Sequence, residues 1–194
     1  MTLPDYYADF ERHFWAIDAA GFWKLERQQT FQEPGYDSWE AFARGEWAES
    51  LRLLEAGRAD MAAYHRRIAD HGFTARRVRV VEEPITAYLQ WELHALRIRD
   101  ECGGPVRVVG PQQVKPLEDS GPLPEIYTLG SAVMYQAVYD EHGILAAARR
   151  FTDPDLIARC RQVIADLYDQ GEPLVDVFTR SVAGLPAPGT QRPA

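Results

Sequence analysis

The stretch Ala75–Val109 reads ARRVRVVEEPITAYLQWELHALRIRDECGGPVRVV and contains the clearest strand pattern of the chain. Its first part, Ala75–Val81, alternates between arginine and valine, which predicts a strand with one polar and one apolar face. Thr86 can cap a following helix whose leucines recur at helical spacing, and Val106–Val109 predicts a second strand. A strand, a helix and a strand within this length indicate a βαβ unit with parallel strands.

The chain before this unit is predicted to be mainly helical. The expected elements are helices over Asp5–Ala19, from Ser38 onward and over Ala59–His71, and a strand over Phe22–Phe31. Ser38 is the expected N-cap of the second helix. Gly45 lies inside that helix and can break it, because glycine costs about 1 kcal/mol relative to alanine.

The chain after this unit is predicted to complete a sheet. The expected elements are a proline-rich loop over Gly110–Pro124, strands over Ile126–Leu129, Val133–Tyr139 and Leu145–Arg150, a helix from Asp153, and a helix over Leu174–Leu185. The fold class is therefore mixed α/β (α+β): a central sheet with a βαβ unit and a hairpin, with N-terminal helices and a C-terminal helix packed on it. We expect one domain over residues 1–185, mainly helical through residue 74, followed by a disordered tail over residues 186–194.

Composition restricts the class of partner. With 194 residues, 46% hydrophobic side chains and a net charge of −8, the chain can bury a core but offers little basic surface, so we expect no direct nucleic-acid binding. It shows neither a signal-peptide pattern nor the ~20-residue apolar run of a membrane helix, so we expect a soluble, cytoplasmic protein with no membrane contact. Cys102 and Cys160 fit no zinc or redox spacing and are expected to be free thiols.

No recognised catalytic or cofactor motif occurs in the sequence. The G-x-S-x-G, HExxH, CxxC, P-loop and G-x-G-x-x-G patterns are all absent, and the five histidines fall mostly on predicted helix surfaces or in a turn. We therefore predict no catalytic residue, no metal site and no cofactor. Enzymatic activity stays open, with a non-enzymatic role favoured.

Polar residues of the βαβ unit form the candidate ligand site. They are Arg79, Glu82, Tyr88, Trp91 and Glu92. Tyr88 and Glu92 share a helix face, and ligands of open α/β sheets favour the crevice at the carboxyl ends of the strands. In the alternative, structural interpretation, Arg79 pairs with Glu92 or Glu26 to join helix to sheet. Trp91 then belongs to the core.

Charged residues on the predicted strands are secondary candidates. Lys24 and Glu26 lie on the early strand, and Arg77 lies beside Arg79 on the strand of the βαβ unit. Charges on a strand indicate either a functional site with perturbed pKa values or a structural network of ion pairs. The second interpretation is the commoner one.

These segments also carry a family resemblance. They are FWKLE at Phe22–Glu26, RRVRVVEEPITAYLQWE at Arg76–Glu92, the hairpin around Tyr127–Ala148, and the helix start at Asp153-Pro154. Over residues 10–170 the chain resembles the actinobacterial domain-of-unknown-function family 6879. Members of that family are often encoded beside helix-turn-helix regulators, so the resemblance implies a regulatory or partner-binding role.

The order of elements is also similar to a half-unit of the phospholipase-D-like fold, which is an analogy at the level of the fold. The enzymes of that superfamily need an H-x-K motif. His94 and His142 are each followed by other residues, so a shared fold would have lost its catalytic pair.

Two functions therefore stay open. The first is a non-enzymatic regulatory or protein-interaction module that partners a helix-turn-helix DNA-binding regulator. The alternative is a small-molecule-binding protein or an enzyme of specialised metabolism that uses the crevice after the strand ending at Val81. Whether the chain forms a homo-oligomer is left open by the sequence.

Overall fold

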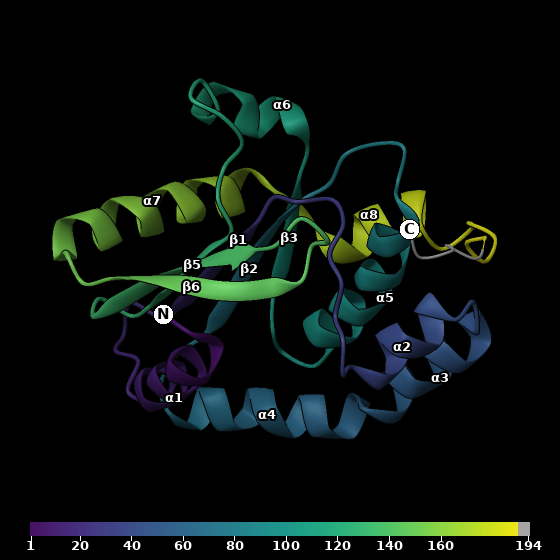
Figure 1. The fold of residues 1–194 in the computed structure, drawn as a ribbon, viewed down its shortest axis with the longest axis horizontal. Coiled ribbons are helices and arrows are strands. Elements are labelled where there is room, and N and C mark those ends of the chain that lie inside the picture. The colour runs from purple at the N-terminus through teal and green to yellow at the C-terminus, as the bar shows by residue number, and fades with distance from the viewer. Residues whose placement is uncertain (190–194) are drawn as a thin grey trace.

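A seven-stranded sheet runs through the computed structural model, which describes residues 1–189 (Figure 1). Its strands are β1 (Phe22–Glu26), β2 (Ala75–Val80), β3 (Val106–Val109), β4 (Ile126–Leu129), β5 (Val133–Tyr139), β6 (Leu145–Phe151) and β7 (Glu172–Pro173), in the order β6-β5-β4-β1-β2-β3-β7. The central strands β1, β2 and β3 are parallel, and all other neighbours are antiparallel. The predicted parallel βαβ unit is therefore confirmed.

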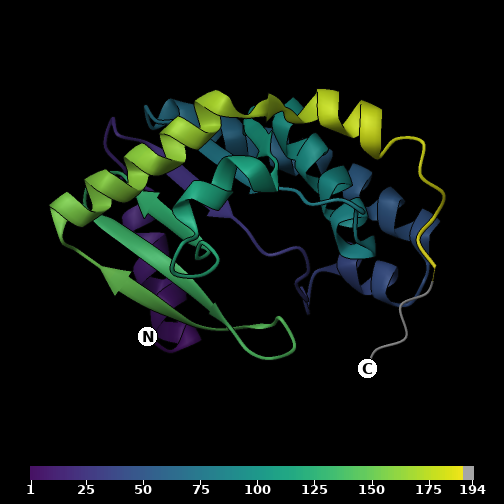
Figure 2. The same cartoon turned by 90° about the horizontal axis from the view of Figure 1, so that it is seen from above.

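Helices cover both faces of the sheet. They are α1 (Leu3–Phe14), α2 (Asp37–Ala43), α3 (Trp47–Ala56), α4 (Arg58–Asp70), α5 (Ala87–Glu101), α6 (Pro111–Val114), the short 3-10 helix η1 (Lys115–Leu117), α7 (Pro154–Gln170) and α8 (Leu174–Ser181). Helix α7 lies on one face, and α1 and α4 lie on the other (Figure 1). Seen from above, the purple α1 lies behind the green β5–β6 hairpin, on the side away from the viewer (Figure 2).

The alternating pattern of β2 explains how the sheet divides its two faces. Val78 and Val80 are fully buried and pack with Ile157 and Ile164 of α7. Arg77 and Arg79, which alternate with these valines, point to the opposite face, as the sequence predicts. On that face a second, largely aromatic core joins α1 to β4 and β5 through residues such as Tyr6 and Tyr135. The mixed α/β fold class is confirmed.

Two helix predictions need correction. The N-cap of α2 is Tyr36, whereas Ser38 lies inside the helix, where its buried hydroxyl bonds Ser50 of α3. The predicted break at Gly45 is confirmed, and this glycine adopts a φ of 80°, which a residue with a Cβ rarely takes. The first helix ends at Phe14, earlier than expected.

The strand predicted over Phe22–Phe31 ends at Glu26. One carboxylate oxygen of Glu125 accepts hydrogen bonds from the backbone N–H groups of Arg27 and Gln28, at 2.8 and 2.7 Å. A side chain thus takes the donors that a longer strand would offer to its neighbour, and the chain turns away from the sheet.

In the C-terminal part of the chain, the structure contains short helices and a short strand that the sequence did not predict. The predicted proline-rich loop contains α6 and η1, β7 was not predicted, and α8 ends at Ser181. Of the predicted tail, Pro186 accepts a hydrogen bond from Gln90, and residues 190–194 lie outside the described residues. Among residues 1–189 no helix is long and apolar enough to cross a membrane.

Candidate ligand-binding cavity

Strands β1 and β2 place charged side chains on the sheet face that α1, α4 and α5 cover. Their register pairs Phe22 with Ala75, Lys24 with Arg77, and Glu26 with Arg79. Alternate residues of a strand share a face, so these pairs form three successive rows. The face is apolar at the start of the strands and charged toward their ends.

A cavity of about 290 Å³ lies over these rows. Its aromatic lining comes from Tyr6, Phe10 and Phe14 of α1, Phe22 of β1, Phe31, Tyr64 of α4, Tyr127 of β4 and Tyr139 of β5. Its charged lining comes from Lys24, Glu26, Glu33, Arg77 and Arg99. Aromatic and ionic groups thus share one open cavity between the sheet and the helices.

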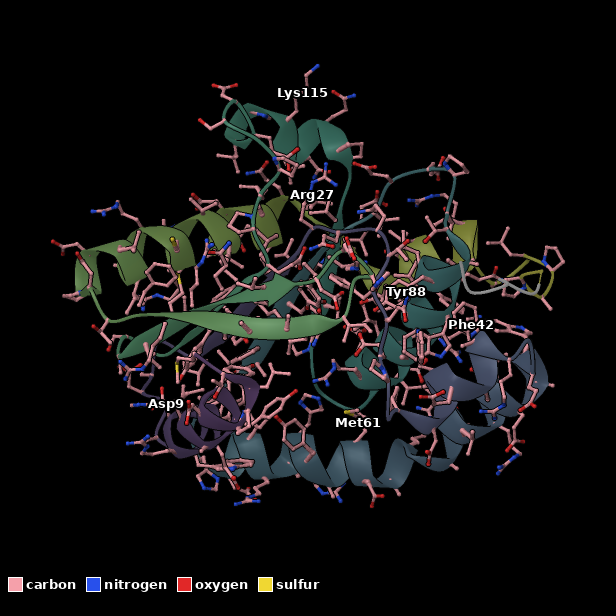
Figure 3. All side chains as sticks on the ribbon, in the orientation of Figure 1. Asp9, Arg27, Phe42, Met61, Tyr88 and Lys115 are labelled. Atoms are coloured by element: carbon pink, nitrogen blue, oxygen red, sulfur yellow. The ribbon has the colours of Figure 1, made fainter. Side chains whose placement is uncertain are left out.

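A second hollow of about 320 Å³ adjoins the first, because the same five charged residues line both. Its other lining residues include Met61 of α4 and Tyr88 and Trp91 of α5. Figure 3 shows Met61 projecting from α4 toward the sheet. The charged residues therefore lie at the junction of the two hollows.

Glu26 is the anionic centre of this junction. Its carboxylate lies 2.5 Å from Lys24 Nζ and 2.6 Å from an Arg77 guanidinium nitrogen. Burial alone would raise the pKa of Glu26, but Arg77 and Lys24 outweigh it and hold the pKa well below its usual range. Glu26 therefore stays ionised at neutral pH, and its single negative charge is shared between Lys24 and Arg77.

Arg79 and Glu92 form a buried ion pair beneath the junction. Arg79 Nε lies 2.7 Å from the Glu92 carboxylate, and Arg79 Nη1 donates to the backbone carbonyls of Glu26 and Val80. The side chain of Arg79 is fully buried and lines neither hollow. Helix α5 is thus joined to β2 as the structural interpretation expects.

Arg99 is the charged residue of the cavity that has no ionic partner. Within residues 1–189 no carboxylate lies within 4 Å of its guanidinium, and its polar contact is His65 Nε2 at 3.4 Å. Part of the side chain faces the cavity, but protein surrounds it so closely that burial lowers its pKa to about 10, helped by the neighbouring charge of Arg77. Arg99 therefore remains a cation at neutral pH.

His65 contacts the Arg99 guanidinium through its ring nitrogen Nε2. Burial, with the positive charges of Arg99 and Arg77, lowers the pKa of His65 to about 4, so its ring is neutral and Nε2 can accept from Arg99. The absence of a side chain at Gly104 leaves room for both residues, because a Cβ there would lie 2.3 Å from the His65 ring and 2.8 Å from Arg99 Cγ.

The predicted site residues divide between several places. Tyr88 and Glu92 line the second hollow, where the Tyr88 hydroxyl donates to Glu33 at 3.0 Å. Trp91 also borders it but is 2% exposed, stacks on Phe42 and donates to Ser38. Binding of a ligand by these residues stays a prediction.

Glu82 lies outside both hollows. It pairs with Arg27 at 2.8 Å near the surface. The crevice after Val81 does exist, with a volume of about 350 Å³ and a lining that includes Val81, Ile85 and Val109. None of the five primary candidates lines it, because Arg79 of β2 and Glu92 of α5 point toward each other between the sheet and the helix and not toward the strand ends.

Sequence reasoning missed Arg99, Glu33 and the aromatic residues of α1. Arg99 follows Glu92 by seven residues, a spacing that places both on one helix face, so the pattern of α5 held a signal for it. Glu33 and the aromatic residues of α1 reach the cavity only through tertiary packing. The secondary candidates Lys24, Glu26 and Arg77 are the ones that the structure brings together in the cavity.

The model of the family Domain of unknown function (DUF6879) matches residues 8–179 of the chain. The chain belongs to this family. The DUF6879 match includes every cavity residue named above except Tyr6. No curated protein matches the chain.

The cavity of this DUF6879 protein does not offer the ligand set of a metal centre. In the described part of the chain, no group of three or more histidine, cysteine or carboxylate side chains is placed to hold a metal ion. The charged lining combines arginine and lysine with two carboxylates, which suits polar and ionic contacts with an organic molecule.

Proposed function

We propose that this protein binds a small organic molecule in the cavity between the sheet and helices α1, α4 and α5. The observation that carries the proposal is the mixed lining of the 290 Å³ space, in which aromatic rings lie together with Lys24, Arg77, Arg99 and two carboxylates. Ligand sites are typically concave and largely apolar, with a few converging polar groups that fix the orientation of the ligand.

The charged lining supports binding better than a purely structural role. A structural network pairs each buried charge, as Arg79 and Glu92 do. Arg99 instead carries a charge into the cavity without a carboxylate partner among residues 1–189. A ligand that supplies the missing partner would be favoured by this arrangement.

A screen of small organic acids, amines and neutral aromatic compounds tests the proposal, with the melting temperature of the full chain as readout. A ligand present at 100 times its Kd adds about 2.7 kcal/mol of stability, which raises the melting temperature by several degrees. We expect at least one such compound. A library that leaves the melting temperature unchanged would contradict the proposal.

Two alanine variants show where a hit binds. Ala137 of β5 lines the cavity, whereas Ala146 of β6 is exposed. Ala137→Leu adds three carbon atoms inside the cavity, so we expect it to weaken binding at least tenfold while the protein stays folded. Ala146→Leu adds the same atoms outside and should leave binding unchanged. Equal affinity for both variants would place the ligand elsewhere.

The regulatory role predicted from the sequence stays a prediction, and it is compatible with ligand binding. A protein that binds a metabolite can pass the signal to a helix-turn-helix partner. A pull-down from native lysate that recovers such a partner would support this role, and one that recovers no stable partner would count against it. Cytoplasmic localisation, an actinobacterial origin and the phospholipase-D-like similarity stay predictions as well.

A further inference from the structure

The ligand class follows from three features of the cavity, and this inference rests on the proposed function. The first feature is the unpaired guanidinium of Arg99. A guanidinium matches a carboxylate through two parallel N–H···O bonds, and such charge-assisted pairs are stronger than neutral hydrogen bonds. Arg99 meets only the neutral His65 ring, at 3.4 Å, so its strongest hydrogen-bonding capacity is unused within residues 1–189.

The second feature is the sign of the charge around Arg99. Three cations and two carboxylates line the cavity, although the whole chain carries a net charge of −8. Glu26 already forms ion pairs with Lys24 and Arg77. Glu33 is exposed at the opening of the cavity and accepts a hydrogen bond from the Tyr88 hydroxyl. An ammonium ligand would face this excess of cations, and a dianion would face both carboxylates. A single negative charge fits best.

The third feature is the group of aromatic side chains around Phe22. The row formed by Phe22 and Ala75 lies two residues along the strands from the row of Lys24 and Arg77, which is about 7 Å. Phe10 and Phe14 of α1 pack edge-on against Phe22 there. Since an apolar cavity of about 150 Å³ holds one benzene molecule, 290 Å³ accommodates a ring with a short polar side chain.

We infer that the ligand is an aromatic monocarboxylate. Its ring lies among the aromatic side chains of α1 and β1, and its carboxylate accepts hydrogen bonds from Arg99.

Three probes of the same length test this ligand class: 3-phenylpropionate, its neutral amide 3-phenylpropionamide, and the cation 3-phenylpropylamine. Calorimetric titration of the full chain should give an affinity for the carboxylate at least tenfold higher than for the amide. The amine should bind more weakly than the amide, since Lys24, Arg77 and Arg99 repel it.

Variants of Arg99 separate recognition of the carboxylate from general binding. Arg99→Met keeps much of the side-chain volume, and we expect it to lower the affinity for 3-phenylpropionate at least tenfold while the affinity for the amide changes less than threefold. Arg99→Lys keeps the charge without the paired donors and should fall between Arg99→Met and the unmodified protein. Arg97→Met, on the same helix but outside the cavity lining, is the control and should change neither affinity.

The outcomes distinguish the ligand class from the proposed function. If the amide or the amine binds as tightly as the carboxylate, or if Arg99→Met retains the preference for the carboxylate, the ligand class is overturned. Sensitivity of that binding to Ala137→Leu would still support the proposed function. Binding of none of the three probes also overturns the ligand class, and the broader library then decides whether the cavity binds anything.

Discussion

Arg79 is the largest side chain that the fold buries completely, and Glu92 is the carboxylate that pairs with its buried charge. The Nη2 atom of Arg79 has no hydrogen-bond partner within residues 1–189, so the residue is already incompletely satisfied. Burial raises the pKa of Glu92, and the nearby Arg79 opposes this rise. Each of the two buried charges therefore needs the other to offset the cost of its burial.

Glu92→Gln is expected to destabilise the protein by about 3–5 kcal/mol, because it leaves the buried guanidinium of Arg79 without its carboxylate. Denaturant unfolding measures this loss. Glu101→Gln is the matched control on the same helix, where the partner Arg58 is one-third exposed, and it should cost less than about 1 kcal/mol. Equal losses for the two variants would contradict the assigned role of the Arg79–Glu92 pair.

Glu125 makes stability depend on pH. Burial, with the neighbouring charge of Glu26, raises the pKa of Glu125 to about 7. The folded protein then holds this proton more tightly than the unfolded chain does, so the contribution to stability is present at low pH. It is lost as the pH rises from about 4.5 through 7.

A comparison with Glu125→Gln isolates this effect, which amounts to about 3 kcal/mol between pH 4.5 and 7. The comparison is needed because the lowered pKa of His65 acts in the opposite direction and adds stability as the pH rises from about 4 to 6.5. Relative to Glu125→Gln, the unmodified protein should lose stability across this range. A difference in the free energy of unfolding that does not change with pH would show that Glu125 titrates normally.

Helix α1 covers the part of the cavity beside Phe22. Asp9 of α1 accepts a hydrogen bond from the buried Tyr135 hydroxyl at 2.6 Å and pairs with Arg150 of β6 at 2.7 Å. Figure 3 labels Asp9 on this helix, below the β5–β6 hairpin. These two contacts tie α1 to the strands that it covers.

Asp9→Ala should loosen α1 because it leaves the buried Tyr135 hydroxyl without its acceptor, at a cost of about 1–3 kcal/mol. Amide hydrogen exchange should become faster in α1 while α7, on the opposite face, keeps its rate. Glu11→Ala, at an exposed position of the same helix, is the control. Equal acceleration in both helices, or none in α1, would contradict the role of Asp9.

Elements with a clear period were predicted well from the sequence. The alternation in β2, the Thr86 cap of α5 and the Asp153 cap of α7 are local signals, and the structure confirms them. The end of β1 was missed because it depends on Glu125, about a hundred residues away. The elements β7 and α6 are two and four residues long, too short to show a period.

At the scale of the whole molecule, the candidate site could be predicted only in part. The sequence identifies Lys24, Glu26 and Arg77 as secondary candidates, because charges on a predicted strand are conspicuous. It could not show that α1, more than sixty residues before α5, closes the same cavity. The location of the cavity also depends on tertiary packing. Lys24, Glu26 and Arg77 line the space between the sheet and the helices and not the crevice after Val81.

The position of a bound aromatic carboxylate in crystals of the full chain shows directly whether the cavity binds this class of ligand. Soaking with 3-(4-bromophenyl)propionate allows anomalous scattering to locate the bromine atom. We predict bromine near Phe22 and Phe10, with the carboxylate within about 2.7–3.2 Å of the Arg99 guanidinium. Bromine outside the cavity, bromine beside Arg99, or no bound bromine at millimolar concentration would contradict the proposed position of the ligand.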